Sequence, residues 1–248
     1  VINPNNPTGA VYSRAMLESI ARLAERHRLV VLADEIYDQM TYDGAEFVPM
    51  ATLVRETLCA TFSGLSKVYR ACGFRVGWVV FSGEREDAGE FLQGIELLSS
   101  LRLCSNVPGQ WAVQTALGGY QSIRDLVRPG GRLFQSRQAI LDAVAASRYL
   151  ALARPMGAMY AFVGVRPDAL PEFDDRAFAM DLLEFKHVLV APGSSFNARC
   201  STHFRVTNLP EPEVLKDVFG RIEEQLDVYA PARAAPAGGA SLKVVAQS

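Results

Sequence analysis

Residues 29–35 read Leu-Val-Val-Leu-Ala-Asp-Glu, a continuous apolar run that ends in two acids. Such a run is typical of a strand buried on both faces of a parallel sheet. Short apolar segments at residues 58–62 and 77–81 predict further buried strands. Ser13 can cap a helix that follows it, and helical patterns recur over residues 87–103 and from residue 109. Strands that alternate with helices favour an α/β fold with a mostly parallel sheet.

The pattern changes after the Pro-Gly-Gly sequence at residues 129–131. A smaller α+β domain is expected there, with helices near 132–146, 176–185 and 213–229 and strands near 159–165, 188–191 and 204–209. The last residues are rich in Ala, Pro and Gly and lack periodicity. We therefore predict a large domain over 1–130, a small domain over 131–229 and a disordered tail over 230–248.

The composition excludes several classes of function. The chain has 248 residues, with 25 basic against 27 acidic side chains, so nucleic acid and anionic membranes are poor partners. No apolar run approaches the roughly 20 residues of a membrane-spanning helix. The four cysteines, at positions 59, 72, 104 and 200, are scattered without a metal-binding spacing. We expect neither a metal nor a disulfide framework, and a reducing cytoplasm as the location.

Three polar segments are expected at one edge of the sheet. In open parallel sheets, ligands bind at the carboxyl ends of the strands. Asp34 ends one predicted strand, the loop over residues 63–76 follows another, and the Asn-Pro-Asn-Asn-Pro-Thr-Gly turn at residues 3–9 belongs there if a strand precedes it. This edge is therefore the predicted site.

Each candidate residue alone is weak evidence for a functional site, but together they indicate one. Lys67 follows Ser63-Gly64-Leu65-Ser66, and a lone loop lysine usually faces solvent, as Arg75 would. Arg205 lies among apolar strand residues, where a guanidinium is costly unless paired, and arginine binds carboxylates through two parallel hydrogen bonds. Together with Asp34, these residues suggest a site with a nucleophilic amine, an acid and two anion-binding arginines.

Asp34-Glu35 has two other interpretations. An apolar run that ends in an acid also fits the magnesium-binding strand of an ATPase. That class needs a GxxxxGK[ST] loop, which these 248 residues do not contain. The acids could also be solvated groups that cap a strand end.

Four segments resemble the signature segments of class I/II aminotransferases of fold type I, which bind pyridoxal phosphate (PLP). They are the turn at 3–9, Ala-Asp-Glu-Ile-Tyr-Asp at 33–38, the segment 63–78, and His-Phe-Arg-Val at 203–206. They occur in the family's order, and the resemblance covers residues 1–229. Segments 102–108 and 118–123 are most similar to bacterial alanine (glutamate–pyruvate) aminotransferases.

The resemblance implies a role for each matched residue around the cofactor ring. Lys67 would form the Schiff base with PLP and would move the proton at the α-carbon of the substrate. Asp34 would pair with the pyridine nitrogen, so that the ring works as an electron sink. Asn6 and Tyr37 would hydrogen-bond the phenolate oxygen of the ring.

The resemblance also implies how anionic groups are bound. Ser66 and Arg75 would bind the phosphate of the cofactor, and Arg205, with Asn6 beside it, would bind the substrate's α-carboxylate. Tyr160 matches a recurrent strand position of the family, and we interpret it as a packing residue.

The resemblance implies an aminotransferase of amino acid metabolism, with alanine and 2-oxoglutarate as the expected substrates and a homodimer as the expected assembly. Alternatives are an aspartate-type aminotransferase, a β-elimination lyase of the same fold, and the non-catalytic ligand-sensing domain of a transcription regulator. Because Val1-Ile2 leads directly into the turn at 3–9, we expect a carboxy-terminal fragment with an incomplete large domain. The family's phosphate loop and ring-stacking aromatic residue would precede it, so the fragment alone is expected to be inactive.

Overall fold

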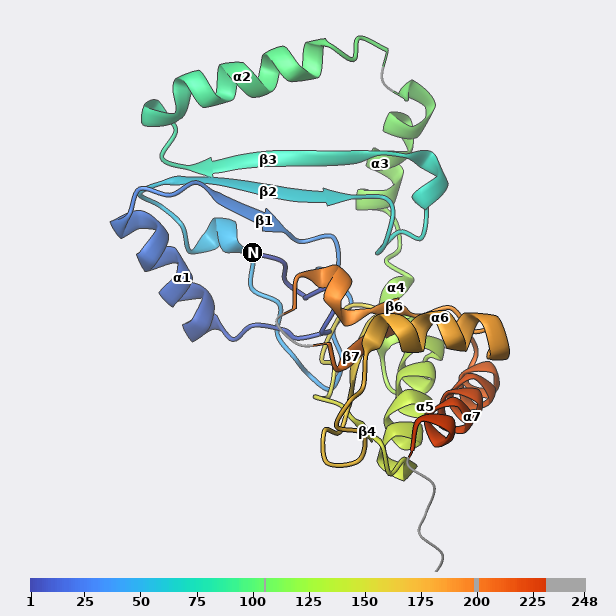
Figure 1. Cartoon of the computed structure of the whole chain (residues 1–248). Helices are drawn as coiled ribbons and strands as arrows, with labels where there is room; N and C mark the ends of the chain where they lie inside the picture. The colour runs from blue at the N-terminus through green and yellow to red at the C-terminus, as the bar shows by residue number, and fades with distance from the viewer. Residues whose placement is uncertain (105, 199–200, 231–248) are drawn as a thin grey trace, which may run out of the picture.

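The computed structural model describes residues 1–104, 106–198 and 201–230 (Figure 1). The predicted tail over 230–248 lies outside the described residues except for Ala230, and Cys200 lies outside them too. The described helices are α1 (Arg14–Arg26), α2 (Gly89–Ser100), α3 (Val107–Gly118), α4 (Ile123–Val127), α5 (Arg132–Ala146), α6 (Asp175–Lys186) and α7 (Pro212–Tyr229). None of these described helices combines the length and the apolar character that crossing a lipid bilayer requires.

The first sheet holds the predicted site edge. It consists of β1 (Val31–Asp34), β2 (Leu58–Gly64) and β3 (Gly77–Gly83), in that order. β1 pairs with β2 in parallel, and Ile2 forms a parallel bridge with Asp34 on the other side. β3 runs antiparallel to β2 because residues 65–76 contain only the short 3₁₀ turn η2 (Cys72–Phe74) and no crossover helix. The fold is α/β as predicted, with one antiparallel strand that the apolar pattern did not reveal.

The prediction that residues 29–33 form a strand buried on both faces is wrong for the described chain. Val31 and Ala33 are buried, whereas Leu32 between them is 52% exposed. Leu29 and Val30 precede β1 and are exposed as well. α1 and the 3₁₀ turn η1 (Met50–Thr52) cover only the face that Val31 and Ala33 occupy.

The second sheet is antiparallel throughout, in the order β4 (Leu150–Ala151), β5 (Tyr160–Val165), β7 (His203–Thr207) and β6 (Ala191–Pro192). Its core joins β5 and β7 to α5, α6 and α7 through Val163, Phe178, Phe204 and Ile222. Within the segment predicted as a strand over 188–191, only Ala191 pairs with a neighbour. The division into domains at residue 130 stays a prediction.

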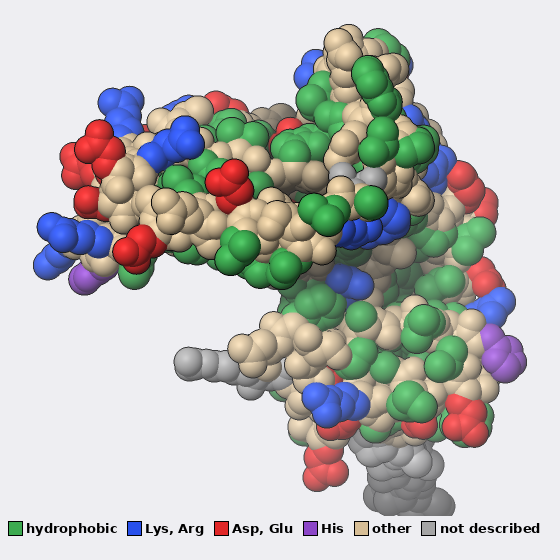
Figure 2. Space-filling view, turned by 90° about the horizontal axis from the view of Figure 1, so that it is seen from above, with side chains coloured by type: hydrophobic (Ala, Val, Ile, Leu, Met, Phe, Trp, Pro, Cys, Tyr) green, Lys and Arg blue, Asp and Glu red, His purple; other side chains and the backbone are tan. Residues whose placement is uncertain are grey.

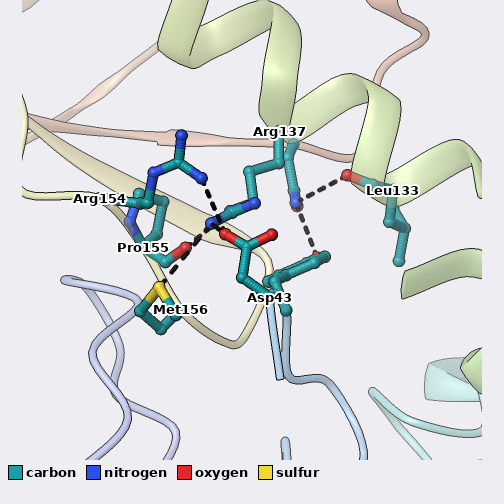
Figure 3. Close-up of polar contacts among 8 residues, drawn as sticks. Asp43, Leu133, Arg137, Arg154, Pro155 and Met156 are labelled. Atoms are coloured by element: carbon teal, nitrogen blue, oxygen red, sulfur yellow. Dashed lines mark hydrogen bonds and ion pairs between the residues drawn. The ribbon is translucent and has the colours of Figure 1, made fainter. Parts of the chain in front are cut away.

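Arg137 of α5 joins the two sheets (Figure 3). The side chain is 1% exposed, its Nη2 lies 2.5 Å from Asp43 Oδ2, and its Nε donates to the Pro155 carbonyl at 2.7 Å. Its guanidinium also lies over the Tyr42 ring, 4.8 Å from the centroid, and Arg154 contacts Asp43 from the exposed side. The segment after β1, the helix α5 and the segment before β5 therefore meet at one buried charge.

The turn at residues 3–9 packs directly against the segment that leads into β5. The amides of Met156 and Gly157 both donate to the Gly9 carbonyl at 2.8 Å. Gly9 has a φ of +68°, and a Cβ there would lie 2.4 Å from the Pro155 Cβ. Only glycine suits this close approach, which brings the turn next to the second sheet.

Asp43→Asn should lower the free energy of unfolding at pH 7 by about 3 kcal/mol, because it leaves the buried Arg137 without its counter-charge. Urea unfolding would measure this loss. Arg154→Ala is the matched control: Arg154 is 54% exposed, and its loss should cost about 0.5 kcal/mol or less. Equal stability of Asp43→Asn and the wild type would contradict the role given to the pair.

The same pair predicts a dependence of stability on pH. The hydrogen bond from Arg137 holds the pKa of Asp43 below its usual value. A lowered folded-state pKa stabilises the fold above the unfolded-state pKa of about 3.9, and this contribution is lost as the pH falls through the folded-state value. The stability difference between the wild type and Asp43→Asn should therefore persist near neutral pH and shrink in acid.

Candidate functional site

The three polar segments predicted at one sheet edge lie there. Asp34 ends β1 opposite Phe62 of the parallel strand β2, which continues to Gly64 and then to Lys67. The Asn3 amide donates to the Asp34 carbonyl at 3.1 Å, so the turn at 3–9 begins beside β1. Parallel pairing places these carboxyl ends next to one another.

The two neighbouring acids at this edge have different environments. The Ile36 amide donates to Asp34 Oδ1 at 3.2 Å, and the Asp34 carboxylate is only partly buried. Glu35 is 7% exposed and accepts a 2.8 Å hydrogen bond from the Met50 amide. Burial raises the pKa of Glu35. Glu35 therefore anchors η1, and Asp34 is the acid that remains for a ligand.

Lys67 lies in a closed loop. The Leu65 amide donates to the Val76 carbonyl at 3.0 Å, which joins the two ends of the loop. The Lys67 side chain is half-buried and makes no hydrogen bond or ion pair within the described part of the chain. Its neighbour Val68 packs in the apolar cluster that contains Tyr37. The loop that carries Lys67 is thus packed against the segment that carries Tyr37.

Ser66 and Arg75 lie inside the loop next to the backbone pair that closes it, Ser66 directly after Leu65 and Arg75 directly before Val76. Arg75 has a left-handed backbone, with a φ of 51°, and its Nη1 donates to the Cys72 carbonyl at 2.6 Å. The rest of its guanidinium is exposed. No direct side-chain contact joins Ser66, Lys67 and Arg75 among the described residues.

Arg205 occupies the open face of β7. Phe204 and Val206 are buried on the opposite face. Arg205 therefore lies outside the core, although its neighbours in the sequence are apolar. Its Nη1 donates to Asn6 Oδ1 at 2.8 Å. The guanidinium lies 4.4 Å from the centroid of the Tyr160 ring and 4.7 Å from that of the Phe196 ring. The turn at 3–9 and the last strands of the chain therefore meet at this arginine.

Tyr37 and Tyr160 connect this arginine to the edge of the first sheet. Their hydroxyl oxygens are 3.1 Å apart, and their rings meet edge to face at 5.8 Å. Burial raises the pKa of Tyr37. The charge of Asp34 adds to that shift, so Asp34 lies near the pair. Tyr37 therefore stays protonated at neutral pH and can donate a hydrogen bond.

The structure joins Asn6, Arg205 and Tyr37 through contacts, with Tyr160 as the connecting residue. Sequence reasoning treated Tyr160 as packing and did not consider Phe196. The informative signal is the strand register: Phe162 lies opposite Arg205, so Tyr160, two residues earlier, shares the face of the arginine. Pairing partners cannot be derived from the two strand sequences alone.

The chain matches known proteins over most of its length. The family described as aminotransferase class I and II matches residues 1–222. The chain is 46% identical over 229 residues to the alanine aminotransferase of Mycobacterium tuberculosis, with 92% of this chain and 53% of that protein covered. It is 44% identical to the glutamate–pyruvate aminotransferase AlaA of Escherichia coli, with 92% and 56% covered. The chain thus spans about half the length of these curated relatives.

Solved structures agree with this match. The fold superposes on an aminotransferase of Escherichia coli with a TM-score of 0.90 at 41% identity, over 94% of this chain and 57% of that one. It superposes on the alanine aminotransferase of Pyrococcus furiosus with a TM-score of 0.84 at 34% identity, over 92% of this chain and 57% of that one.

Glu35→Ala should lower the free energy of unfolding by about 1–3 kcal/mol, because the buried Met50 amide loses its acceptor. Glu35→Gln keeps a side-chain oxygen and should recover most of that loss. Glu46, whose side chain is 77% exposed, is the matched control, and its change to Ala should be nearly neutral. Urea unfolding of the three variants tests the anchor, and equal stability of Glu35→Ala and the wild type would refute it.

Proposed function

Because this chain belongs to the aminotransferase class I and II family, we propose that the protein is a PLP-dependent aminotransferase. It moves an amino group between an L-amino acid and a 2-oxo acid, and alanine and 2-oxoglutarate are the favoured substrates. The main support for the proposal is the hydrogen bond from Arg205 to Asn6. It brings a guanidinium that can bind a carboxylate next to the motif at 3–9. The relatives named alanine and glutamate–pyruvate aminotransferase support the choice of substrates.

The residues at the sheet edge suit PLP, on which proteins of this family and fold depend. PLP has an aldehyde, a pyridine nitrogen, a phenolate oxygen and a phosphate. The edge presents the amine of Lys67, which makes no hydrogen bond or ion pair with the residues that the structure describes, a carboxylate on Asp34 and a protonated hydroxyl on Tyr37. The hydroxyl of Ser66 and the exposed guanidinium of Arg75 complement a phosphate.

PLP, when bound, supplies the electron sink, and the chain supplies position and proton transfer. Lys67 would hold the cofactor through its side-chain amine and, once the substrate amine has displaced it, would take and return the proton at the α-carbon of the substrate. Asp34 would keep the pyridine nitrogen protonated. Tyr37 would donate to the phenolate oxygen, with Asn6 beside it.

Anion binding falls to two separate groups. Ser66 and Arg75 would bind the phosphate of the cofactor from the loop after β2. Arg205 binds the α-carboxylate that every amino acid and 2-oxo acid substrate shares. One guanidinium nitrogen of Arg205 donates to Asn6, and the other N–H groups remain for the substrate. A planar fork with free N–H groups suits a carboxylate better than a lysine ammonium does.

We further propose a homodimer, the typical assembly of aminotransferases, and a cytoplasmic location. Figure 2 shows apolar side chains on the face where α2 lies nearest the viewer. The exposed apolar residues of α2, α3 and their connection include Leu97, Leu98, Leu101, Leu103 and Trp111. Exposed apolar area of this kind favours a protein interface.

Lys67→Ala in the intact protein should abolish transamination and the cofactor absorbance at about 400–430 nm together, because no amine remains to bond PLP. Absorbance spectra and alanine–2-oxoglutarate turnover would measure both losses. Lys216→Ala is the control, since that lysine is 61% exposed on α7 and should retain both properties. A PLP adduct that borohydride still reduces in Lys67→Ala would refute the assignment.

Arg205→Lys should raise KM for both alanine and 2-oxoglutarate by about 10–100-fold, since an ammonium cannot reproduce the fork. The affinity for PLP should change little, which equilibrium titration of the cofactor would show. Arg166→Lys, on an exposed loop, is the control for the same chemical change. Loss of PLP binding with unchanged KM would mean that Arg75 and Arg205 exchange their roles.

A further inference from the structure

Tyr160 has two contacts of different kinds within the site. The face of its ring lies against the Arg205 guanidinium, 4.4 Å from the centroid, and its hydroxyl lies 3.1 Å from that of Tyr37. One side chain thus touches both the group proposed to bind substrate and the group proposed to face the cofactor. We propose that Tyr160 is a positioning residue for both, a role that rests on the function proposed above.

The backbone of Tyr160 is held from both sides. It begins β5 opposite Thr207, and the Thr207 hydroxyl and the Asn208 amide both donate to the Met159 carbonyl, at 3.1 and 3.0 Å. On the other side, a Cβ on Gly9 would lie 2.8 Å from the Tyr160 carbonyl oxygen, so the turn at 3–9 packs tightly there. The ring therefore projects from a fixed position.

The ring of Tyr160 forms one wall of a cage around Arg205. Phe196 forms a second wall at 4.7 Å, from the 3₁₀ turn η4 (Gly193–Phe196). That turn is anchored by the Ser194 amide, which donates to the buried carboxylate of Asp175 at 2.6 Å. The two aromatic rings restrict the orientation of the guanidinium, and the Arg205 nitrogens that do not donate to Asn6 remain for a ligand. The rings thus orient the guanidinium for a carboxylate.

The hydroxyl of Tyr160 acts on Tyr37. Each tyrosine hydroxyl has one proton to donate and can accept others. If Tyr37 donates its proton to the phenolate oxygen of the cofactor, the hydrogen bond between the two tyrosines must run from Tyr160 to Tyr37. A hydroxyl that accepts a hydrogen bond becomes a stronger donor in a low-dielectric site. Tyr160 therefore strengthens the donation by Tyr37 and lowers the proton affinity of the bound cofactor.

The two contacts can be separated by two substitutions. Tyr160→Phe removes only the hydroxyl: the pH midpoint of the cofactor absorbance should rise by about half a unit, roughly threefold in proton affinity, while KM changes less than about twofold. Tyr160→Leu removes the ring as well, and KM for both alanine and 2-oxoglutarate should rise about five- to tenfold in addition.

The experiment is an absorbance titration of the PLP-loaded intact protein from about pH 5 to 9, with KM and kcat measured on the same preparations. Tyr149→Phe is the control, because that hydroxyl is bonded to Asp227, away from the site. It should match the wild type in midpoint and KM. If Tyr160→Leu does not fold, the midpoint of the isosteric Tyr160→Phe decides the role of the hydroxyl.

The outcomes separate this proposal from the function on which it rests. A wild type that shows no PLP absorbance overturns the proposed function, and the role of Tyr160 falls with it. A wild type that binds PLP and transaminates, with Tyr160→Phe unchanged in midpoint, overturns the role of the hydroxyl alone. An unchanged KM in a folded Tyr160→Leu variant would show that the ring packs against Arg205 without orienting it.

Discussion

The contact between the two sheets that carry the site contains one buried charge. Arg137 is almost fully excluded from solvent, and a lone guanidinium there would be strongly unfavourable. Asp43, the Pro155 carbonyl and the Tyr42 ring together compensate it (Figure 3). These partners belong to segments that continue from β1 and into β5. The same segments pair through the backbone, because the Tyr42 amide donates to the Met156 carbonyl at 2.9 Å and the Ala158 amide to the Met40 carbonyl at 2.8 Å. The guanidinium therefore reinforces this pairing with a buried ion pair.

The site is assembled across this joint. Tyr37 follows β1 of the first sheet, and Tyr160 begins β5 of the second, yet their hydroxyls are within hydrogen-bonding distance. Asn6 and Arg205 make a second connection from the turn at 3–9 to β7. A shift of one sheet against the other by the length of a bond would break both contacts. The contacts of the site therefore depend on the relative placement of the two sheets.

Local features were predictable from the sequence, and features that depend on pairing were not. The helix α5 has the predicted bounds, and Ser13 caps α1, because period and capping act within one turn of a helix. The edge that gathers Asp34 and the loop with Lys67 followed from the order of the motifs. The antiparallel β3, the exposure of Leu32 and the contacts of Tyr160 depend on which segments become neighbours, which composition and period do not determine. Arg205 shows the difference: its residue type pointed to carboxylate binding, but its place on the open face came from the register.

The charges of the site edge follow from the opposite orientations of Asp34 and Glu35. Glu35 is turned into the core against Met50, so of these two acids Asp34 is the one left for the site edge. Arg205 is bonded to a neutral amide, and Lys67 makes no ion pair among the described residues, so these cations are not neutralised by neighbouring carboxylates. An edge with surplus positive charge, held on fixed strands, attracts anionic ligands and is stabilised by them. A phosphate bound by Arg75 and a carboxylate bound by Arg205 would supply that compensation. The orientation of one structural acid therefore leaves the edge suited to an anionic cofactor and an anionic substrate at once.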